Sequence, residues 1–116
     1  MSSRVHSSSL GLLLAELPSR VRTLVDTSVF ARLDTAERLV VERLAEANGS
    51  HVVAYDLRAT GKRLPLCAVV AQADLDRGQI AALRAAEQGI GPWIALVAYA
   101  RPAELRQPEE VRPASQ

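Results

Sequence analysis

Aromatic residues and cysteine are scarce in this chain. A single cysteine, Cys67, rules out an internal disulfide. The complete aromatic set is Phe30, Tyr55, Trp93 and Tyr99, which is too small for a single-strand nucleic-acid binder built from stacked rings. The sequence also lacks a glycine-rich phosphate loop, a paired Cys or Cys/His metal spacing, and a Gly-x-Ser-x-Gly nucleophile motif. None of these common catalytic signatures therefore points to a reaction.

An excess of one charge and a long apolar run are lacking too. The chain holds 14 basic and 13 acidic residues, a net charge of +1, so charge alone gives no argument for a polyanionic partner. The apolar run at residues 10–15 stops at Glu16, well short of the roughly 18 apolar residues of a membrane span. No small-residue cleavage pattern follows it. We expect a cytoplasmic protein without membrane contact.

Composition divides the 116 residues into four parts. Serine in residues 1–9 and proline in residues 102–116 predict flexible tails. Residues 10–33 form a helical N-terminal extension, with helices over 10–17 and 19–25 separated by Pro18. Residues 34–101 form the core domain. A hydrophobic content of 48% is enough for one globular domain that needs no disulfide or metal to fold.

Two helices of the core carry clear end signals. Asp34 or Thr35 can cap the first helix, and Asp34 and Glu37 have the spacing of a capping box. Asn48-Gly49 supplies a left-handed stop, so a helix is predicted up to residue 48. Its predicted buried stripe is Ala36, Leu39, Val40, Leu44 and Ala47. A second helix begins after Asp74 or Asp76 and ends at Gly89.

Three segments read as strands. Residues 51–57 alternate in polarity, residues 64–71 are nearly all apolar, and residues 93–100 are apolar on both faces. The Gly-containing turn at 58–63 predicts a hairpin between the first two strands. The second helix predicts a crossover that connects the second strand to a parallel third strand. The fold class expected is a small single domain, α+β or α/β, with an α-β-β-α-β core and a mixed three-stranded sheet.

An acid and a cation stand together at the end of the first strand. Asp56 and Arg58 share one side of it, and such a pair can hold a divalent metal and orient a phosphate, as metal-assisted phosphodiester cleavage requires. Asp56 is thus a candidate metal ligand and catalytic residue, and Arg58 a candidate catalytic residue. The alternative is an ion pair in solvent. Cys67 is expected to be a buried thiol, and His51 a solvent-facing or hydrogen-bonded histidine.

Three short motifs carry a family resemblance. They are the run Tyr-Asp-Leu-Arg-Ala-Thr at 55–60, Leu-Pro-Leu at 64–66, and Gln79-Ile80. With them, residues 48–99 resemble the core of RecU-type Holliday-junction resolvases, of the PD-(D/E)xK nuclease superfamily. Arg58 stands in place of the family's catalytic lysine, Ala59 in place of its next acid, and its upstream metal-binding aspartate has no equivalent.

The resemblance implies a nucleic-acid-associated protein with a nuclease-like fold whose catalysis is weakened or lost. Arg58, Lys62 and Arg63 would contact the DNA backbone. No cofactor is expected, except Mg²⁺ at Asp56 if cleavage of DNA junctions survives.

The same residues support an alternative. The segment from Val52 to Leu66 also resembles the start of Roadblock-type dimeric regulatory domains, which implies a small non-enzymatic protein-interaction module: an adaptor, an inhibitor or an assembly subunit. A strand that is apolar on both faces must be buried against other protein surface, so a homodimer or a protein partner is expected. Segment 10–17 or a sheet edge would form the contact. Trp93 is expected to be a core or interface anchor.

Overall fold

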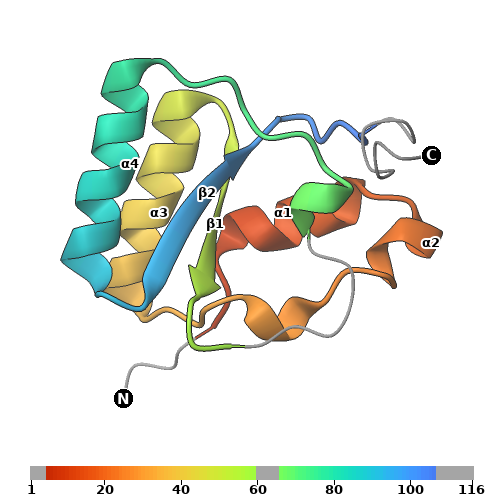
Figure 1. Ribbon diagram of the computed structural model, residues 1–116, viewed down its shortest axis with the longest axis horizontal. Coiled ribbons are helices and arrows are strands. Elements are labelled where there is room, and N and C mark those ends of the chain that lie inside the picture. Colours follow the sequence, from red (N-terminus) through yellow and green to blue (C-terminus); the bar gives the residue numbers. More distant parts are fainter. Residues whose placement is uncertain (1–4, 60–65, 107–116) are drawn as a thin grey trace, which may run out of the picture.

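A computed structural model of the protein describes residues 5–59 and 66–106. Its elements follow one another from an N-terminal helix to a C-terminal strand (Figure 1). In chain order they are α1 (Ser8–Glu16), α2 (Ser19–Arg22), the 3-10 helix η1 (Thr27–Val29), α3 (Thr35–Asn48), β1 (His51–Asp56), the 3-10 helix η2 (Leu66–Ala68), α4 (Arg77–Ile90) and β2 (Ile94–Tyr99). No helix in the described ranges is long and apolar enough to cross a membrane.

The sheet lies between two helical layers. β1 and β2 pair antiparallel, with His51 opposite Tyr99 and Asp56 opposite Ile94. Helices α3 and α4 cover one face of this pair, and α1 packs on the other (Figure 1). Because neighbouring side chains of a strand point to opposite faces, Val52 and Ala54 enter the core under α3 and α4, while Val53 enters the core under α1.

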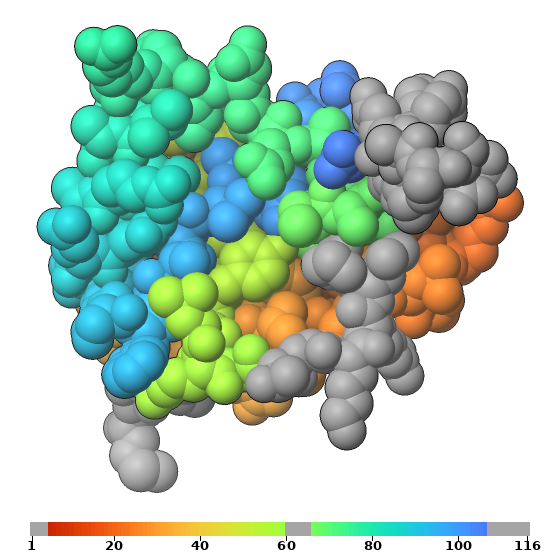
Figure 2. Space-filling model, in the orientation of Figure 1, coloured from red at the N-terminus to blue at the C-terminus, as the bar shows by residue number. Residues whose placement is uncertain are grey.

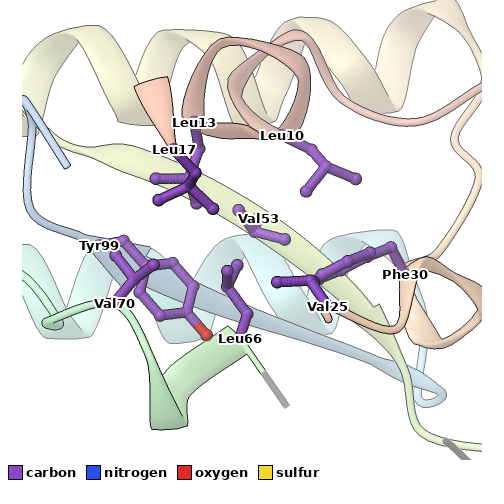
Figure 3. Packing of buried hydrophobic residues seen from close by; sticks show 9 residues of the cluster. All are labelled: Leu10, Leu13, Leu17, Val25, Phe30, Val53, Leu66, Val70 and Tyr99. Atoms are coloured by element: carbon purple, nitrogen blue, oxygen red, sulfur yellow. The ribbon is translucent and has the colours of Figure 1, made fainter. Parts of the chain in front are cut away.

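Nine buried side chains fill the core on the α1 side (Figure 3). They come from α1, from the segment before α3, from both strands and from the segment around η2. The set is Leu10, Leu13, Leu17, Val25, Phe30, Val53, Leu66, Val70 and Tyr99. Three leucines of segment 10–17, which was expected to contact a partner, are thus buried within the chain itself, and that prediction is wrong for them; Leu12 remains 58% exposed.

The predicted mixed three-stranded sheet is wrong, because the described residues form a sheet of only two antiparallel strands. Residues 64 and 65 of the expected middle strand lie outside the described ranges, and the rest forms η2 followed by an isolated bridge from Val70 to Leu105. A second isolated bridge joins Gln72, just after this segment, to Tyr99. The backbone that follows η2 therefore bonds to two different segments: Ala71 N donates to Glu104 O at 2.8 Å, whereas Ala73 N donates to Ala98 O at 2.9 Å. The hairpin and the parallel crossover are therefore wrong as well.

The helix ends follow the predicted caps. Asp34 Oδ1 accepts a hydrogen bond from Glu37 N at 2.8 Å, and Gly49 ends α3 with φ 62°. Asp76, rather than Asp74, caps α4 by accepting from Gln79 N at 2.7 Å. Both caps satisfy backbone N–H groups that have no partner within a first helical turn.

The buried face of α3 differs from the predicted stripe. Val41 and Ala45 are buried, whereas Leu39 and Val40 are 46% and 41% exposed. The apolar residues of α3 are spread around much of its circumference, so its sequence pattern is compatible with more than one buried face. Packing against β1 and α4 selects the face of Val41, and it leaves Val40 on the surface.

Candidate functional site

Asp56 and Arg58, the two residues singled out in the sequence, do lie together where β1 ends. Arg58 Nε is 3.1 Å from Asp56 Oδ1, and a terminal guanidinium nitrogen of Arg58 is 3.2 Å from Oδ2. The backbone N of Arg58 donates to the same carboxylate at 2.9 Å. The side-chain hydrogen bonds of Arg58, followed by its backbone hydrogen bond, lower the pKa of Asp56. This geometry is that of an ion pair with both groups charged.

The other two predicted site residues, Lys62 and Arg63, lie outside the described residues, so their place relative to Asp56 and Arg58 stays a prediction. Residues 5–59 and 66–106 hold no group of three His, Cys, Asp or Glu side chains placed to hold a metal ion. Asp56 as a metal ligand, and Arg58 as a phosphate contact or catalytic group, stay predictions. Cys67, expected to be buried, is exposed. His51 is buried, and its Nε2 lies 3.1 Å from Glu16 Oε1.

Trp93 stands beside the Asp56–Arg58 pair. Its backbone O accepts a hydrogen bond from Leu57 N at 2.8 Å, which fixes the chain just before β2 to the chain just after β1. The Arg58 guanidinium carbon lies 5.8 Å from the centre of the Trp93 ring, within cation–π range. The indole is nevertheless 54% exposed. Trp93 is therefore not a core residue, and its role as an interface anchor stays a prediction.

Two neighbouring hollows lie near this end of the sheet. One, of about 230 Å³, is lined by Trp93, Arg58 and Ile90 among others. The other, of about 280 Å³, lies between the start of α3 and the end of α4 and includes Val40. Glu37 and Ile90 line both hollows, so the two are adjacent. We call the surface formed by Val40, Arg58, Ile90 and Trp93 the Trp93 corner; it lies where α4 passes into β2, at the lower left of Figure 1.

Charges at the Trp93 corner are engaged within the chain. Arg58 binds Asp56, as described. Glu37 Oε1 accepts a hydrogen bond from the backbone N of Asp34 at 2.9 Å as part of the α3 capping box. A partner that docked here would meet the exposed apolar side chains of Trp93 and Val40 beside an ion pair that is already formed.

A separate and larger hollow lies on the α1 side of the sheet. Its volume is about 520 Å³, and its walls come from both strands, from η2 and from the segment around η1. In Figure 2, yellow-green atoms of the β1 segment are seen between the blue atoms of β2 and the orange atoms that precede α3. The lining set is Asp26, Val29, Tyr55, Asp56, Leu57, Ala59, Cys67, Gln72, Ala95, Val97 and Tyr99. We call this space the tyrosine hollow.

Two phenols form its polar centre. The hydroxyl groups of Tyr55 and Tyr99 are hydrogen-bonded to each other. Burial raises the pKa of Tyr55 to about 12 and also raises the pKa of Tyr99. Both phenols therefore keep their protons at neutral pH. Tyr99 is fully buried, whereas Tyr55 is only partly buried.

Neither tyrosine is among the site residues predicted from the sequence. Alternation along β1 and β2 places Tyr55 on the same sheet face as Ala95, Val97 and Tyr99, but only if the two strands pair with each other. The predicted pairing of 51–57 with 64–71 hid that relationship.

Comparison of this chain with models of protein families, with curated proteins and with solved structures finds no match in any of the three. The resemblances to RecU-type resolvases and to Roadblock-type domains therefore stay predictions.

Proposed function

We propose that this protein is a non-enzymatic protein-interaction module that pairs with a second copy of itself through the Trp93 corner. The observation that carries this proposal is the exposure of Trp93, at 54%, at the edge of a hollow that has a second hollow next to it. Tryptophan and arginine are enriched at the energetic centre of protein interfaces. Here the Arg58 guanidinium lies over the Trp93 ring, 5.8 Å from its centre.

The chemistry of the corner favours a protein surface over a polyanion. Arg58 is bound to Asp56 on two carboxylate oxygens, so a phosphate would have to compete with an ion pair that is already formed. The exposed side chains next to it, Trp93 and Val40, are apolar and gain most from contact with another apolar surface.

A second copy fits because the corner has both a protruding side chain and a hollow that could receive one. Trp93 is the protruding side chain, and the hollow of about 230 Å³ beside it is the concave half. A two-fold axis would place Trp93 of each copy against the hollow of the other, as self-complementary dimer interfaces require. Val40 and Ile90, which line the adjacent second hollow, extend the apolar area of each copy.

Sedimentation velocity over a range of concentrations tests this proposal. We expect the wild-type chain to shift from monomer to dimer as concentration rises, and Trp93→Ala to stay monomeric. Leu24→Ala is the matched control, because Leu24 is 53% exposed but lies away from the corner; it should behave as the wild type. A wild-type chain that is monomeric throughout the micromolar range would overturn the pairing, as would a Trp93→Ala dimer of unchanged affinity.

A further inference from the structure

We infer that the tyrosine hollow is a binding site for a neutral, mainly apolar small molecule that carries one hydrogen-bond acceptor such as a carbonyl oxygen. This site is distinct from the Trp93 corner and independent of the pairing proposed there. The first ground is size. A volume of about 520 Å³ lies within the range of roughly 300–1,000 Å³ that is typical of small-molecule sites.

The second ground is the mixture of groups in the walls. Val29, Ala95 and Val97 supply apolar surface, and the phenols of Tyr55 and Tyr99 supply the polar groups. A mainly apolar wall with a few convergent polar groups is the common composition of ligand pockets.

The third ground is the count of protons in the tyrosine pair. Two phenol hydroxyls carry two protons, and their mutual hydrogen bond uses only one of them. If Tyr55 were the donor, the proton of the fully buried Tyr99 would be left without this partner, which is costly for a buried hydroxyl. Tyr99 is therefore the better donor, and the Tyr55 proton is then free to meet an acceptor in the hollow.

The charged groups of the walls point to a neutral ligand. Asp26 and Asp56 both line the hollow, and Asp56 is already paired with Arg58. Among the described residues that line the hollow, none is lysine, arginine or histidine, so a carboxylate or sulfonate ligand would meet no cation there. A neutral acceptor, such as a ketone, ester or amide oxygen, needs no cation and can still bind the Tyr55 hydroxyl.

Two dyes test the ligand class. Nile red is a neutral apolar dye with a ring carbonyl, and anilinonaphthalene sulfonate is an apolar anion. We expect saturable fluorescence enhancement with Nile red at one site per chain, and much weaker binding of the anion. Tyr55→Phe keeps the ring but removes the hydroxyl, and it should weaken Nile red binding about fivefold to tenfold, the loss of one hydrogen bond.

Filling the hollow tests the location. Val97→Phe should abolish Nile red binding, and the smaller change Ala95→Leu should reduce it if the larger one disturbs folding, which far-UV circular dichroism reports. Leu24→Ser is the control for loss of an exposed apolar side chain elsewhere. Trp93→Ala should leave dye binding unchanged even if it abolishes pairing, so the two proposals can fail separately.

The single cysteine gives a second readout of location. Cys67 is exposed and lines the hollow, so saturating Nile red should slow its reaction with Ellman's reagent severalfold. The inference is overturned if Nile red does not bind saturably, if Val97→Phe and Ala95→Leu bind it as the wild type does, if Tyr55→Phe has no effect, if the anionic dye binds as tightly, or if bound dye leaves the Cys67 rate unchanged.

Discussion

The buried His51 and the exposed Glu16 join the start of β1 to the end of α1. His51 Nε2 lies 3.1 Å from Glu16 Oε1, and the same carboxylate oxygen accepts a hydrogen bond from the backbone N of Ala103 at 2.6 Å. Glu16 therefore holds together three segments that are distant in the sequence. Ala103 belongs to the proline-rich stretch that was expected to be a flexible tail, and this contact ties its first residues to the core.

This contact predicts a loss of stability in acid. The hydrogen bond from Ala103 N, followed by the hydrogen bond from His51, lowers the pKa of Glu16 below its ordinary value of 4.5. A carboxyl whose pKa is lower in the folded state stabilises the fold above the unfolded pKa, and the contribution is lost as pH falls through the folded pKa.

Glu16→Gln should remove that part of the pH dependence while keeping an acceptor for Ala103. Thermal unfolding between pH 7 and pH 3 measures it: the wild-type midpoint should fall more steeply in acid than that of the variant. Parallel curves for the two proteins would show that Glu16 does not contribute.

Two neighbouring leucines of α1 provide a matched pair for the core. Leu13 is fully buried under the sheet, whereas Leu12 is 58% exposed. Leu13→Ala should lower the free energy of unfolding by about 2–5 kcal/mol, because it leaves a cavity in the core of Figure 3. Leu12→Ala should change it by less than about 0.5 kcal/mol. Urea denaturation followed by circular dichroism measures both, and equal losses would contradict the packing of α1.

The helix caps predict a second comparison. Asp34→Ala and Asp76→Ala each remove a side chain that accepts from a first-turn backbone N–H. Each should lower the free energy of unfolding by about 1 kcal/mol. Asp74→Ala is the control, since Asp74 precedes the cap of α4 and does not form it. Denaturation curves in which Asp74→Ala is as damaging as Asp76→Ala would contradict the assignment of the cap.

Local signals account for what could be predicted from the sequence. The capping box of Asp34 and Glu37, the left-handed Gly49 and the alternation along 51–56 each depend on a few adjacent residues, and the structure confirms them. The pairing of β1 with β2 spans more than thirty residues, and an apolar strand pattern does not state its partner. Residues 66–71 form the short η2 and an isolated bridge in place of the predicted strand. Their apolar sequence is compatible with either structure.

The candidate sites also differ in whether they depend on local sequence or on the pairing of distant strands. The Asp56–Arg58 pair was found because its residues are two apart. The Trp93 corner combines Val40 of α3 with residues at the end of β1, the end of α4 and the start of β2. The tyrosine hollow depends on the two strands being partners. Neither could be assembled before that pairing was known. The exposure of Cys67 was missed for a related reason, since it was placed on a buried strand that does not form.

DNA association stays a prediction of the sequence, and it has its own test. Binding to a labelled four-way junction through Arg58, Lys62 and Arg63 should weaken as salt rises, because phosphate contacts release counterions. Replacing the three residues together with alanine should then abolish binding in an electrophoretic mobility assay, and Mg²⁺ should matter only if cleavage survives. Unchanged binding by the triple variant would remove the predicted site.

Fluorescence of Trp93 tests the proposed pairing most directly. Trp93 is the only tryptophan of the chain, and its ring is 54% exposed in the single copy. Because pairing buries the indole against the other copy, its emission maximum should lie at shorter wavelength at high protein concentration and move to longer wavelength on dilution. The same midpoint should appear in sedimentation. An emission maximum that stays at the position of an exposed indole at every concentration would contradict the account.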